Sequence, residues 1–347
     1  VRLVGLGGRD LPAQVIERLR VEVTWPDGSG TIHTLRNGAL HTDGTVVLVM
    51  NERTLLSRPG GLKGVNPASS VPQAPPGPYR VRVYIGELLV SESSFSVEKS
   101  RVNVQPLPGQ LKVTVPVASD AVITVSTHFG TPMEGALLEL SGLAVEAVGA
   151  QGAYVAGRGG VIEVPCVLLS YISEGKSVPA IFKARVVSWR AMPIDYEEEL
   201  YAATRVDVVV PKIGKLVVKA VGTRGQGLPG AAVTLRGPAE IRGATGSAGT
   251  WECEVVEGLW NVTVEKGGKA ASVLAEVRGS EVTEARVKLD IFISIFGADL
   301  SALEFALSVA GVIAVVLMTY VATIEYRSWR AKRVVRVLKP AERPREQ

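Results

Sequence analysis

Two patterns of apolar and polar residues divide this chain of 347 residues. Up to about residue 290, apolar and polar side chains alternate over short segments such as Leu216–Val221 and Tyr79–Tyr84. Because successive side chains of a strand point to opposite faces, this alternation predicts β-strands with one buried face. Phe305–Ile324, in contrast, is a run of twenty uncharged residues, which predicts a helix. At about 1.5 Å per residue, that helix spans about 30 Å, the thickness of a bilayer's hydrocarbon core.

The residues around the uncharged run predict where this helix begins and ends. Ser301 and Glu304 have the spacing of a capping box, in which each side chain accepts a hydrogen bond from the other residue's backbone N–H. The helix is expected to continue past the run to about Lys339, because Pro340 ends it. The alternative is a buried helix of a large soluble domain, but an uninterrupted apolar run of this length is rare in soluble cores.

Basic residues are concentrated after the uncharged run. Three glutamates and eight basic residues follow Ile324, the latter being Arg327, Arg330, Lys332, Arg333, Arg336, Lys339, Arg343 and Arg345. The positive-inside rule places this basic tail, residues 325–347, in the cytoplasm and the chain before the helix outside the cell. The first five basic residues, up to Arg336, are the expected cytoplasmic anchor at the membrane surface.

The charge balance of the remaining chain excludes one class of partner. Residues 1–324 hold 30 basic and 31 acidic residues, so the sequence pI near 9.0 comes from the tail. Nucleic-acid binding requires a positive surface, and none is expected here. The expected partners are the lipid bilayer and other surface or membrane proteins. Ala306, Ala310 and Ala314 lie four residues apart, a spacing that permits close helix contact, so an oligomer is an open alternative.

Strand and turn signals are clearest over residues 215–289. The segment LVVKAVGTRGQGLPGAAVTLRG is followed by TGSAGTWECEV and then by GLWNVTVEKGG, so Gly-rich turns separate short alternating strands. This order resembles the transthyretin-like, carboxypeptidase regulatory-like β-sandwich family. Trp260 stands where that family usually has Tyr, and Ser247–Gly249 replaces its common Asp-containing turn. The resemblance implies a sandwich that serves as an adhesive, stalk or accessory domain and carries no catalytic residues of its own.

Looser versions of the same order precede this unit, which predicts an internal repeat. A single alternating sheet cannot cover its own apolar face, so each unit needs a second sheet. The expected fold class is therefore all-β, with three tandem Ig-like or transthyretin-like β-sandwiches followed by one C-terminal transmembrane helix. The expected segments are a sandwich at 1–107 with a Pro/Gly-rich insertion at 58–78, sandwiches at 108–211 and 212–290, a juxtamembrane segment at 291–304, the helix at 305–324 and the tail at 325–347.

The residues needed for catalysis are sparse. The chain has three histidines and no HExxH, G-x-S-x-G, Walker or dinucleotide-binding motif, so no enzyme, metal or cofactor is expected. Cys166 and Cys253 fall in different predicted domains, which favours two small buried side chains over the alternative of a disulfide. The acidic segment Pro193–Thr204 is expected to be a loop or short helix. Its run Asp195–Glu199 is more typical of a solvated face than of a divalent-cation site.

One modification signal is present. Asn261, Val262 and Thr263 form the only N-glycosylation sequon of the chain. The strand alternation places Trp260 and Val262 on the inner face and Asn261 on the outer face. Asn261 is therefore a candidate glycosylation site, and an unmodified strand residue that faces solvent is the alternative.

These expectations favour a non-catalytic, membrane-anchored extracellular protein with a structural, adhesive or tethering role, comparable to a cell-surface stalk. Two alternatives stay open: an accessory subunit of a membrane enzyme or transporter, or the C-terminal anchor region of a longer secreted hydrolase. The numbered chain begins at Val1 without a signal-peptide pattern, so either a removed signal or an upstream domain is expected before it.

Overall fold

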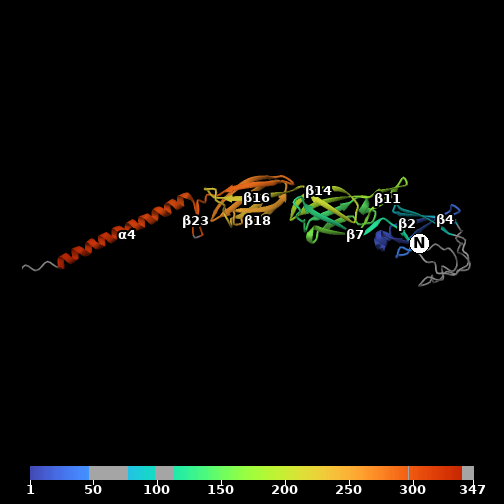
Figure 1. The fold of residues 1–347 in the computed structure, drawn as a ribbon, viewed down its shortest axis with the longest axis horizontal. Coiled ribbons are helices and arrows are strands. Elements are labelled where there is room, and N and C mark those ends of the chain that lie inside the picture. Colours follow the sequence, from blue (N-terminus) through green and yellow to red (C-terminus); the bar gives the residue numbers. More distant parts are fainter. Residues whose placement is uncertain (47–76, 98–111, 296, 338–347) are drawn as a thin grey trace, which may run out of the picture. The chain divides into compact units, whose positions relative to one another are not determined.

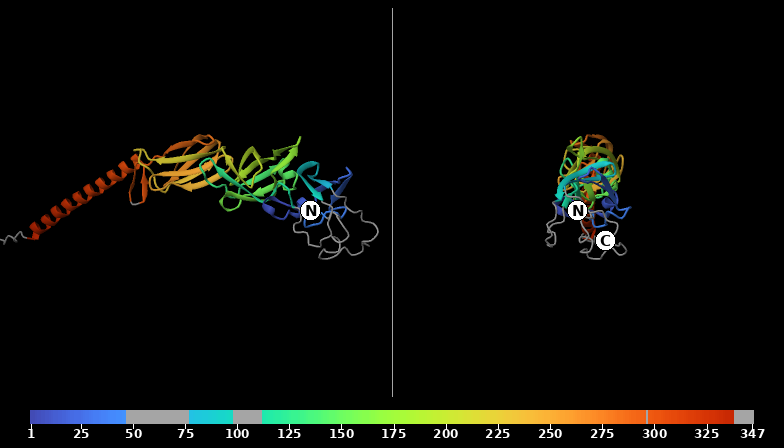
Figure 2. Two further views of the ribbon diagram at one scale, coloured as in Figure 1. Left: turned by 45° about the vertical axis from the view of Figure 1, so that its right-hand side comes forward. Right: turned by 90° about the vertical axis from the view of Figure 1, so that its right-hand side faces the viewer.

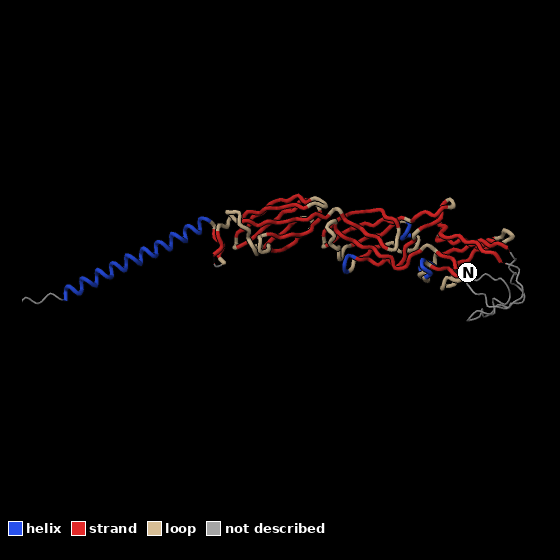
Figure 3. Tube along the Cα trace, viewed as in Figure 1, coloured by secondary structure: helices blue, strands red, loops and turns tan. Residues whose placement is uncertain are grey.

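The computed structural model describes residues 1–46, 77–97, 112–295 and 297–337, with the backbone alone for 331–337. These residues form two compact units that divide after Ile213. Strands dominate both units, and the one long helix of the described residues follows them (Figure 1; Figure 3, strands red). The expectation of an all-β chain with one C-terminal apolar helix is confirmed. Most of the insertion expected at 58–78 lies outside the described residues; its last two residues begin a strand.

The first part of the N-terminal unit is built around one antiparallel sheet of order β3-β2-β4-β5. Its elements are β1 (Arg2–Val4), η1 (Leu6–Gly8), α1 (Ala13–Ile16), β2 (Leu19–Thr24), β3 (Gly30–Thr34), β4 (Gly77–Ile85) and β5 (Leu88–Val97). Alternate residues of β2 and β4, among them Val21, Val23 and Val81, are fully buried, as the alternation predicts. β1 pairs in parallel with β6 (Lys112–Thr114).

Two sheets form the next part of this unit, with orders β10-β7-β15 and β14-β13-β8-β9. Their strands are β7 (Val117–Thr127), β8 (Leu137–Ser141), β9 (Gly152–Val155), β10 (Val161–Leu168), β13 (Ile181–Trp189), β14 (Met192–Tyr201) and β15 (Arg205–Val210). The connections contain α3 (Leu143–Glu146), η2 (Arg158–Gly160) and the hairpin of β11 (Ser170–Ser173) and β12 (Lys176–Pro179). The first and last strands, β7 and β15, pair in parallel.

The acidic segment Pro193–Thr204 was expected to be a loop or short helix, and this prediction is wrong. Met192–Tyr201 forms β14, which pairs antiparallel with β13. Basic side chains of β13 face the carboxylates: Arg185 Nη2 lies 2.7 Å from Asp195 Oδ1, and Lys183 Nζ lies 3.0 Å from Glu197 Oε1. Cross-strand pairs of opposite charge favour a strand that the acidic composition alone disfavours.

The second unit, which begins at Gly214, repeats this topology. Its sheets have orders β19-β16-β22 and β18-β17-β20-β21, and β16 pairs in parallel with the last strand, β22. The strands are β16 (Ile213–Val221), β17 (Ala232–Arg236), β18 (Glu240–Ala244), β19 (Thr250–Val256), β20 (Gly258–Lys266), β21 (Lys269–Val277) and β22 (Val282–Lys288). In chain order, the strands β16 to β22 correspond one by one to β7, β8, β9, β10, β13, β14 and β15. The hairpin β11–β12 is an insertion in the first unit. Two of the three expected repeats thus share one topology.

The core of this second sandwich lies between its two sheets. Trp260 on β20 is completely buried, and its Nε1 donates a hydrogen bond to the Val256 carbonyl at 2.9 Å. Leu216 and Val218 on β16 and Leu235 on β17 are also fully buried. The inward residues predicted by alternation therefore form one continuous apolar layer.

A short hairpin and a long helix follow the second sandwich. The hairpin consists of β23 (Ile293–Ile295) and β24 (Ala298–Leu300), and the helix α4 runs from Ala302 to Val337. Within the described residues, Ala302–Arg330 is the one helical stretch long and apolar enough to cross a membrane, and none of it is buried against the protein. In Figures 1 and 2, no other described element of the second unit lies along α4 beyond its start.

Neither cysteine is in a disulfide in the described structure. Cys166 on β10 is fully buried, where Gln14 Nε2 lies 2.8 Å from its sulfur, and burial raises the pKa of its thiol. Cys253 on β19 is half-buried, and its thiol donates to the Glu254 carbonyl at 3.6 Å. Cys166 thus matches the expectation of a small buried side chain, whereas Cys253 is only partly enclosed.

Candidate functional site

The junction between the second sandwich and α4 is the best-defined arrangement of side chains near the membrane-crossing candidate. At the start of the helix, the Ser301 N–H donates to Glu304 Oε2 at 2.6 Å, and the Glu304 N–H donates to Ser301 Oγ at 3.2 Å. These are the reciprocal hydrogen bonds of a capping box, which satisfy two of the N–H groups left open at a helix start. The backbone N–H of Phe305 then donates to the Ser301 carbonyl.

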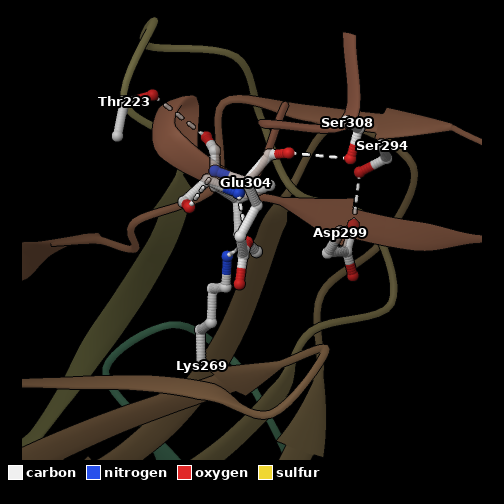
Figure 4. A network of polar contacts seen from close by, with 8 residues as sticks. Thr223, Lys269, Ser294, Asp299, Glu304 and Ser308 are labelled. Carbon is white, nitrogen blue, oxygen red and sulfur yellow. Dashed lines mark hydrogen bonds and ion pairs between the residues drawn. The ribbon is translucent and has the colours of Figure 1, made fainter. Parts of the chain in front are cut away.

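An ion pair joins the capped helix to the sandwich. Lys269, the first residue of β21, contacts Glu304 through its Nζ (Figure 4). The Lys269 side chain is only 20% exposed, so it lies mostly against the protein. One carboxylate therefore caps α4 and also binds the turn that connects β20 to β21. The Glu304 carboxylate thus holds the helix start both through its hydrogen bond to Ser301 and through its ion pair with Lys269.

The hairpin β23–β24 packs against the same turn. The Ser294 hydroxyl donates to Asp299 Oδ1 across the hairpin (Figure 4). A Cβ placed on Gly267 would lie only 2.7 Å from the Asp299 Cβ. Gly267 also has a φ of +57°, in the left-handed region that favours glycine. This turn thus needs Gly267 for its backbone and for the close approach of β24.

We expect Gly267→Ala to loosen the junction more than Gly268→Ala does. Both glycines have positive φ, but a Cβ on Gly268 would meet nothing within 4 Å. The alanine at 267 has to push Asp299 away. The amides of β23 and β24 should therefore exchange roughly tenfold faster than in Gly268→Ala, which corresponds to a loss of about 1.4 kcal/mol in the free energy of local opening. Hydrogen exchange of the full chain in detergent measures this. Equal exchange in the two variants would show that the close contact does not hold the hairpin.

A second turn holds the chain between β22 and β23. Gln226 Nε2 donates to the carbonyls of Ile291 and Phe292 at 3.0 and 3.1 Å. The Thr223 hydroxyl donates to the Ile291 carbonyl at 3.2 Å (Thr223 is labelled in Figure 4). The Thr223 N–H donates to the same Ile291 carbonyl at 2.9 Å. Ile291 itself is completely buried. The backbone that leads to the helix is therefore part of the sandwich rather than a free linker.

Aromatic contacts continue from this segment into the helix. The rings of Phe292 and Phe305 lie 5.7 Å apart, and the Arg224 guanidinium lies 5.3 Å from the Phe292 ring. Phe305 is the first residue of the uncharged run. The apolar run thus starts in contact with the sandwich, and a cation lies beside that contact.

The helix beyond Phe305 satisfies its own polar groups. Ser308, Thr319 and Thr323 each donate a hydroxyl hydrogen bond to the carbonyl four residues earlier, at 2.7 to 2.8 Å. In hydrocarbon an unsatisfied polar group costs several kcal/mol, so this bonding makes the helix compatible with lipid. Its large apolar side chains are exposed throughout, for example Leu317 at 57%. An exposed apolar surface of this extent requires a cover, and lipid provides one.

The predicted cytoplasmic anchor lies on the same helix. Arg327 and Arg330 are exposed on α4, and Lys332, Arg333 and Arg336 lie on its last described turns. Tyr326 and Trp329 lie at the start of this basic stretch, with rings 6.3 Å apart. Aromatic rings next to basic residues are typical of the region where a helix leaves the hydrocarbon core.

Asn261 lies on the outer face of the sheet β18-β17-β20-β21. It is exposed, and its cross-strand neighbours are Arg236 on β17 and Leu274 on β21. Leu274 and Leu259, two residues before Asn261, are exposed by 71% and 66%. The sequon residue therefore lies between two leucines that no described part of the chain covers.

No metal-binding cluster accompanies these features in the described residues. No group of three or more His, Cys, Asp or Glu side chains there is arranged to hold a metal ion. Carboxylates of the acidic run Asp195–Glu199 form ion pairs with β13 instead, as described above.

Sequence reasoning found the capping residues but missed their partners. Lys269, Gly267 and Gln226 all contact the junction, yet they lie 35 or more residues before Glu304 in the sequence. The two consecutive glycines before Lys269 indicated a tight turn, which the resemblance already included as a hairpin. Nothing local indicated that this turn contacts the helix.

Comparison with known proteins gives only remote similarities. No family model matches the chain, and no curated protein sequence matches it. Among solved structures, the Bacillus anthracis TIE protein is 13% identical with a TM-score of 0.23, over 83% of this chain and 49% of that one, so the chain spans about half its length. The minor pilin GBS52 of Streptococcus agalactiae is 14% identical, over 49% of this chain and 95% of that one, with a TM-score of 0.22. The shaft pilin SpaA of Lactobacillus rhamnosus GG is 9% identical, over 50% and 99%, with a TM-score of 0.26. These values are too low to support a conclusion about function.

Proposed function

We propose that this chain is a non-catalytic, membrane-anchored surface protein whose β-sandwiches act as a structural, adhesive or tethering stalk. The observation that carries the proposal is the junction: a capping box, an ion pair and a buried segment join a sandwich to a helix with an exposed, uncharged run. Such an arrangement holds the sandwich at a defined place beside the bilayer. The helix provides attachment, and the sheets provide reach and surface for a partner.

The proposal includes an orientation. Residues 1–304 lie outside the cell, 305–324 cross the bilayer, and the basic tail 325–347 lies in the cytoplasm, where Arg327, Arg330, Lys332, Arg333 and Arg336 contact anionic headgroups. The capping residues Ser301 and Glu304 lie where the helix enters the membrane. We also propose that three sandwiches end near residues 107, 211 and 290. The last of these, which is the sandwich of the second unit, is proposed to belong to the transthyretin-like, carboxypeptidase regulatory-like family. Its quoted segments supply β16, β17, β19 and β20, in support of that assignment.

The experiment that tests this function combines topology with partner identification. Protease added to intact cells should digest the sandwiches and leave the tail protected. The protein should be purified from native membranes in mild detergent, and co-purifying proteins identified by mass spectrometry. Surface or envelope proteins are the expected partners. Stoichiometric recovery with an enzyme or transporter would instead support an accessory subunit, and a tail cut before the sandwiches would reverse the orientation.

We further propose that Asn261 carries an N-linked glycan. The sequon lies outside the membrane in the proposed orientation, and both Asn261 and Thr263 belong to the outward-facing row of β20. A glycan on Asn261 would cover Leu259 and Leu274, which explains why two exposed leucines flank it.

The glycan is tested by the mass of the protein from its native membranes. Asn261→Gln and Thr263→Val should remove the added mass, because each destroys the sequon. Thr263→Ser is the matched control and should keep it, since serine preserves the sequon. A wild-type protein with the mass of its unmodified sequence would show that Asn261 is not used.

A further inference from the structure

The hairpin β23–β24 separates apolar from polar side chains by face. Residues paired across an antiparallel hairpin share a face, so Ile293 with Leu300 and Ile295 with Ala298 form one face. The other face holds the pair Ser294 and Asp299. One face is thus entirely apolar and the other entirely polar.

On the polar face, Asp299 contacts the sandwich, whereas Ser294 is exposed. Asp299 packs against the Gly267 turn, where a Cβ on the glycine would nearly touch it, and Ser294 hydrogen-bonds to Asp299. The apolar face therefore points away from that turn. Ala298 is exposed, and Ile293, Ile295 and Leu300 are only half-buried. None of these four apolar side chains is fully buried by the described chain, so the apolar face is open to a further contact.

The hairpin lies directly beside the start of the membrane-crossing candidate. Only Ser301 separates β24 from α4, and Phe292 before β23 contacts Phe305, the first residue of the uncharged run. From Ser301 to Phe305 a helix rises about 6 Å. The headgroup region on each side of the hydrocarbon core is about 5–8 Å thick. The hairpin is thus within a headgroup's thickness of the hydrocarbon boundary.

A cation lies beside the residue that precedes the hairpin. Arg224 is exposed in the turn after β16, with its guanidinium over the Phe292 ring. The planar guanidinium group of arginine donates two parallel hydrogen bonds to phosphate oxygens. An apolar face on the hairpin and an arginine close to its start match the two chemical layers of a phospholipid interface.

We propose that the hairpin β23–β24 rests in the phospholipid interface beside α4, with Ile293, Ile295, Ala298 and Leu300 against acyl chains and Arg224 against headgroup phosphates. This inference depends on the proposed membrane anchor. The hairpin is then a second lipid contact besides the helix. Two contacts restrict the tilt of the sandwich relative to the bilayer, which a single helix leaves free.

Depth-dependent quenching of the full chain in vesicles tests the proposal. Three variants with one added cysteine each, Ala298→Cys, Ser272→Cys and Ala314→Cys, carry the fluorophore NBD on that cysteine in a Cys253→Ser background, where buried Cys166 stays unlabelled. The vesicles contain phosphatidylcholine and phosphatidylglycerol, with a nitroxide either near the headgroup or deep in the acyl chain. Ser272 is an exposed residue of β21 and is the matched control, and Ala314 reports the anchor.

The hairpin probe should respond to the shallow nitroxide. An interfacial segment lies about 5–10 Å into the headgroup and acyl boundary, so Ala298→Cys should lose roughly half of its emission to the shallow nitroxide and less to the deep one. Ser272→Cys should keep its emission, and Ala314→Cys should respond most to the deep nitroxide. Adding Ile295→Asp should return the Ala298 probe to its aqueous emission, whereas adding Ser272→Asp should not.

The outcomes separate the hairpin from the anchor. A quenched Ala314 probe with an Ala298 probe that behaves like Ser272 overturns the hairpin contact alone. An Ala314 probe without quenching overturns the anchor and the hairpin contact together. A blue-shifted Ala298 probe in native membranes but not in pure lipid vesicles would assign the apolar face to a protein partner and overturn the lipid contact.

Discussion

Trp260→Ala is expected to lower the free energy of unfolding of the second unit by about 3–5 kcal/mol, because it leaves a large cavity in a closed core. The Trp260 ring is completely buried, and its indole N–H satisfies the Val256 carbonyl. The alanine removes both the packing and the hydrogen bond. Hydrogen exchange of the amides in β16 to β22, measured on the full chain in detergent, gives the opening free energy of this unit separately from the other.

Two comparisons make this result specific. Trp260→Phe keeps an aromatic ring and should cost clearly less than the alanine. The amides of β7 to β15 should exchange as in the wild type, because those strands belong to the other compact unit. A loss of protection confined to β20 would show that Trp260 supports its own strand and not the whole sandwich.

The second large effect is expected in the helix. Replacing both Ala314 and Leu317 by arginine should disfavour membrane insertion by roughly 5–7 kcal/mol, since each arginine at a helix centre costs about 2.5–3.5 kcal/mol. These residues lie near the middle of the uncharged run, and both are exposed on α4. The fraction of protein that stays in the membrane after alkaline carbonate extraction should fall from nearly all to a minor part.

The matched control exchanges the two side chains. Ala314→Leu combined with Leu317→Ala keeps the composition and should leave the membrane fraction unchanged. Retention of the double-arginine variant in the carbonate pellet would mean that another part of the chain or a tightly bound partner holds the protein. In that case α4 would be a docking helix and not the anchor.

The strands could be predicted from the sequence where burial on one face controls the local pattern. Leu216 and Val218 alternate with outward residues, and both are buried as expected. The segment around Asp195 was mispredicted because its strand depends on Lys183 and Arg185 of the neighbouring strand. Its acidic composition disfavours a strand, and only the cross-strand charges offset that preference.

At the junction too, residues that interact over a short stretch of sequence could be predicted, and partners from distant parts of the chain could not. Ser301 and Glu304 interact over three residues, so their spacing alone was enough to single them out. Lys269 and Gln226 reach the junction only through the folded sandwich, and no spacing rule relates them to the helix. The apolar face of β23–β24 was also hidden in the sequence, because the register that separates Ser294 and Asp299 from their apolar neighbours is a property of the hairpin.

The parallel pairing of the first and last strands has a mechanical consequence. In β16 and β22, seven residue pairs align from Lys215 with Val282 to Val221 with Lys288. The chain therefore enters this sandwich at one end and leaves it at the other. A force that pulls an outer partner away from the bilayer would load these hydrogen bonds in shear, all together, whereas a hairpin would open one bond at a time. Single-molecule pulling should accordingly record one high-force event for this sandwich rather than a gradual extension.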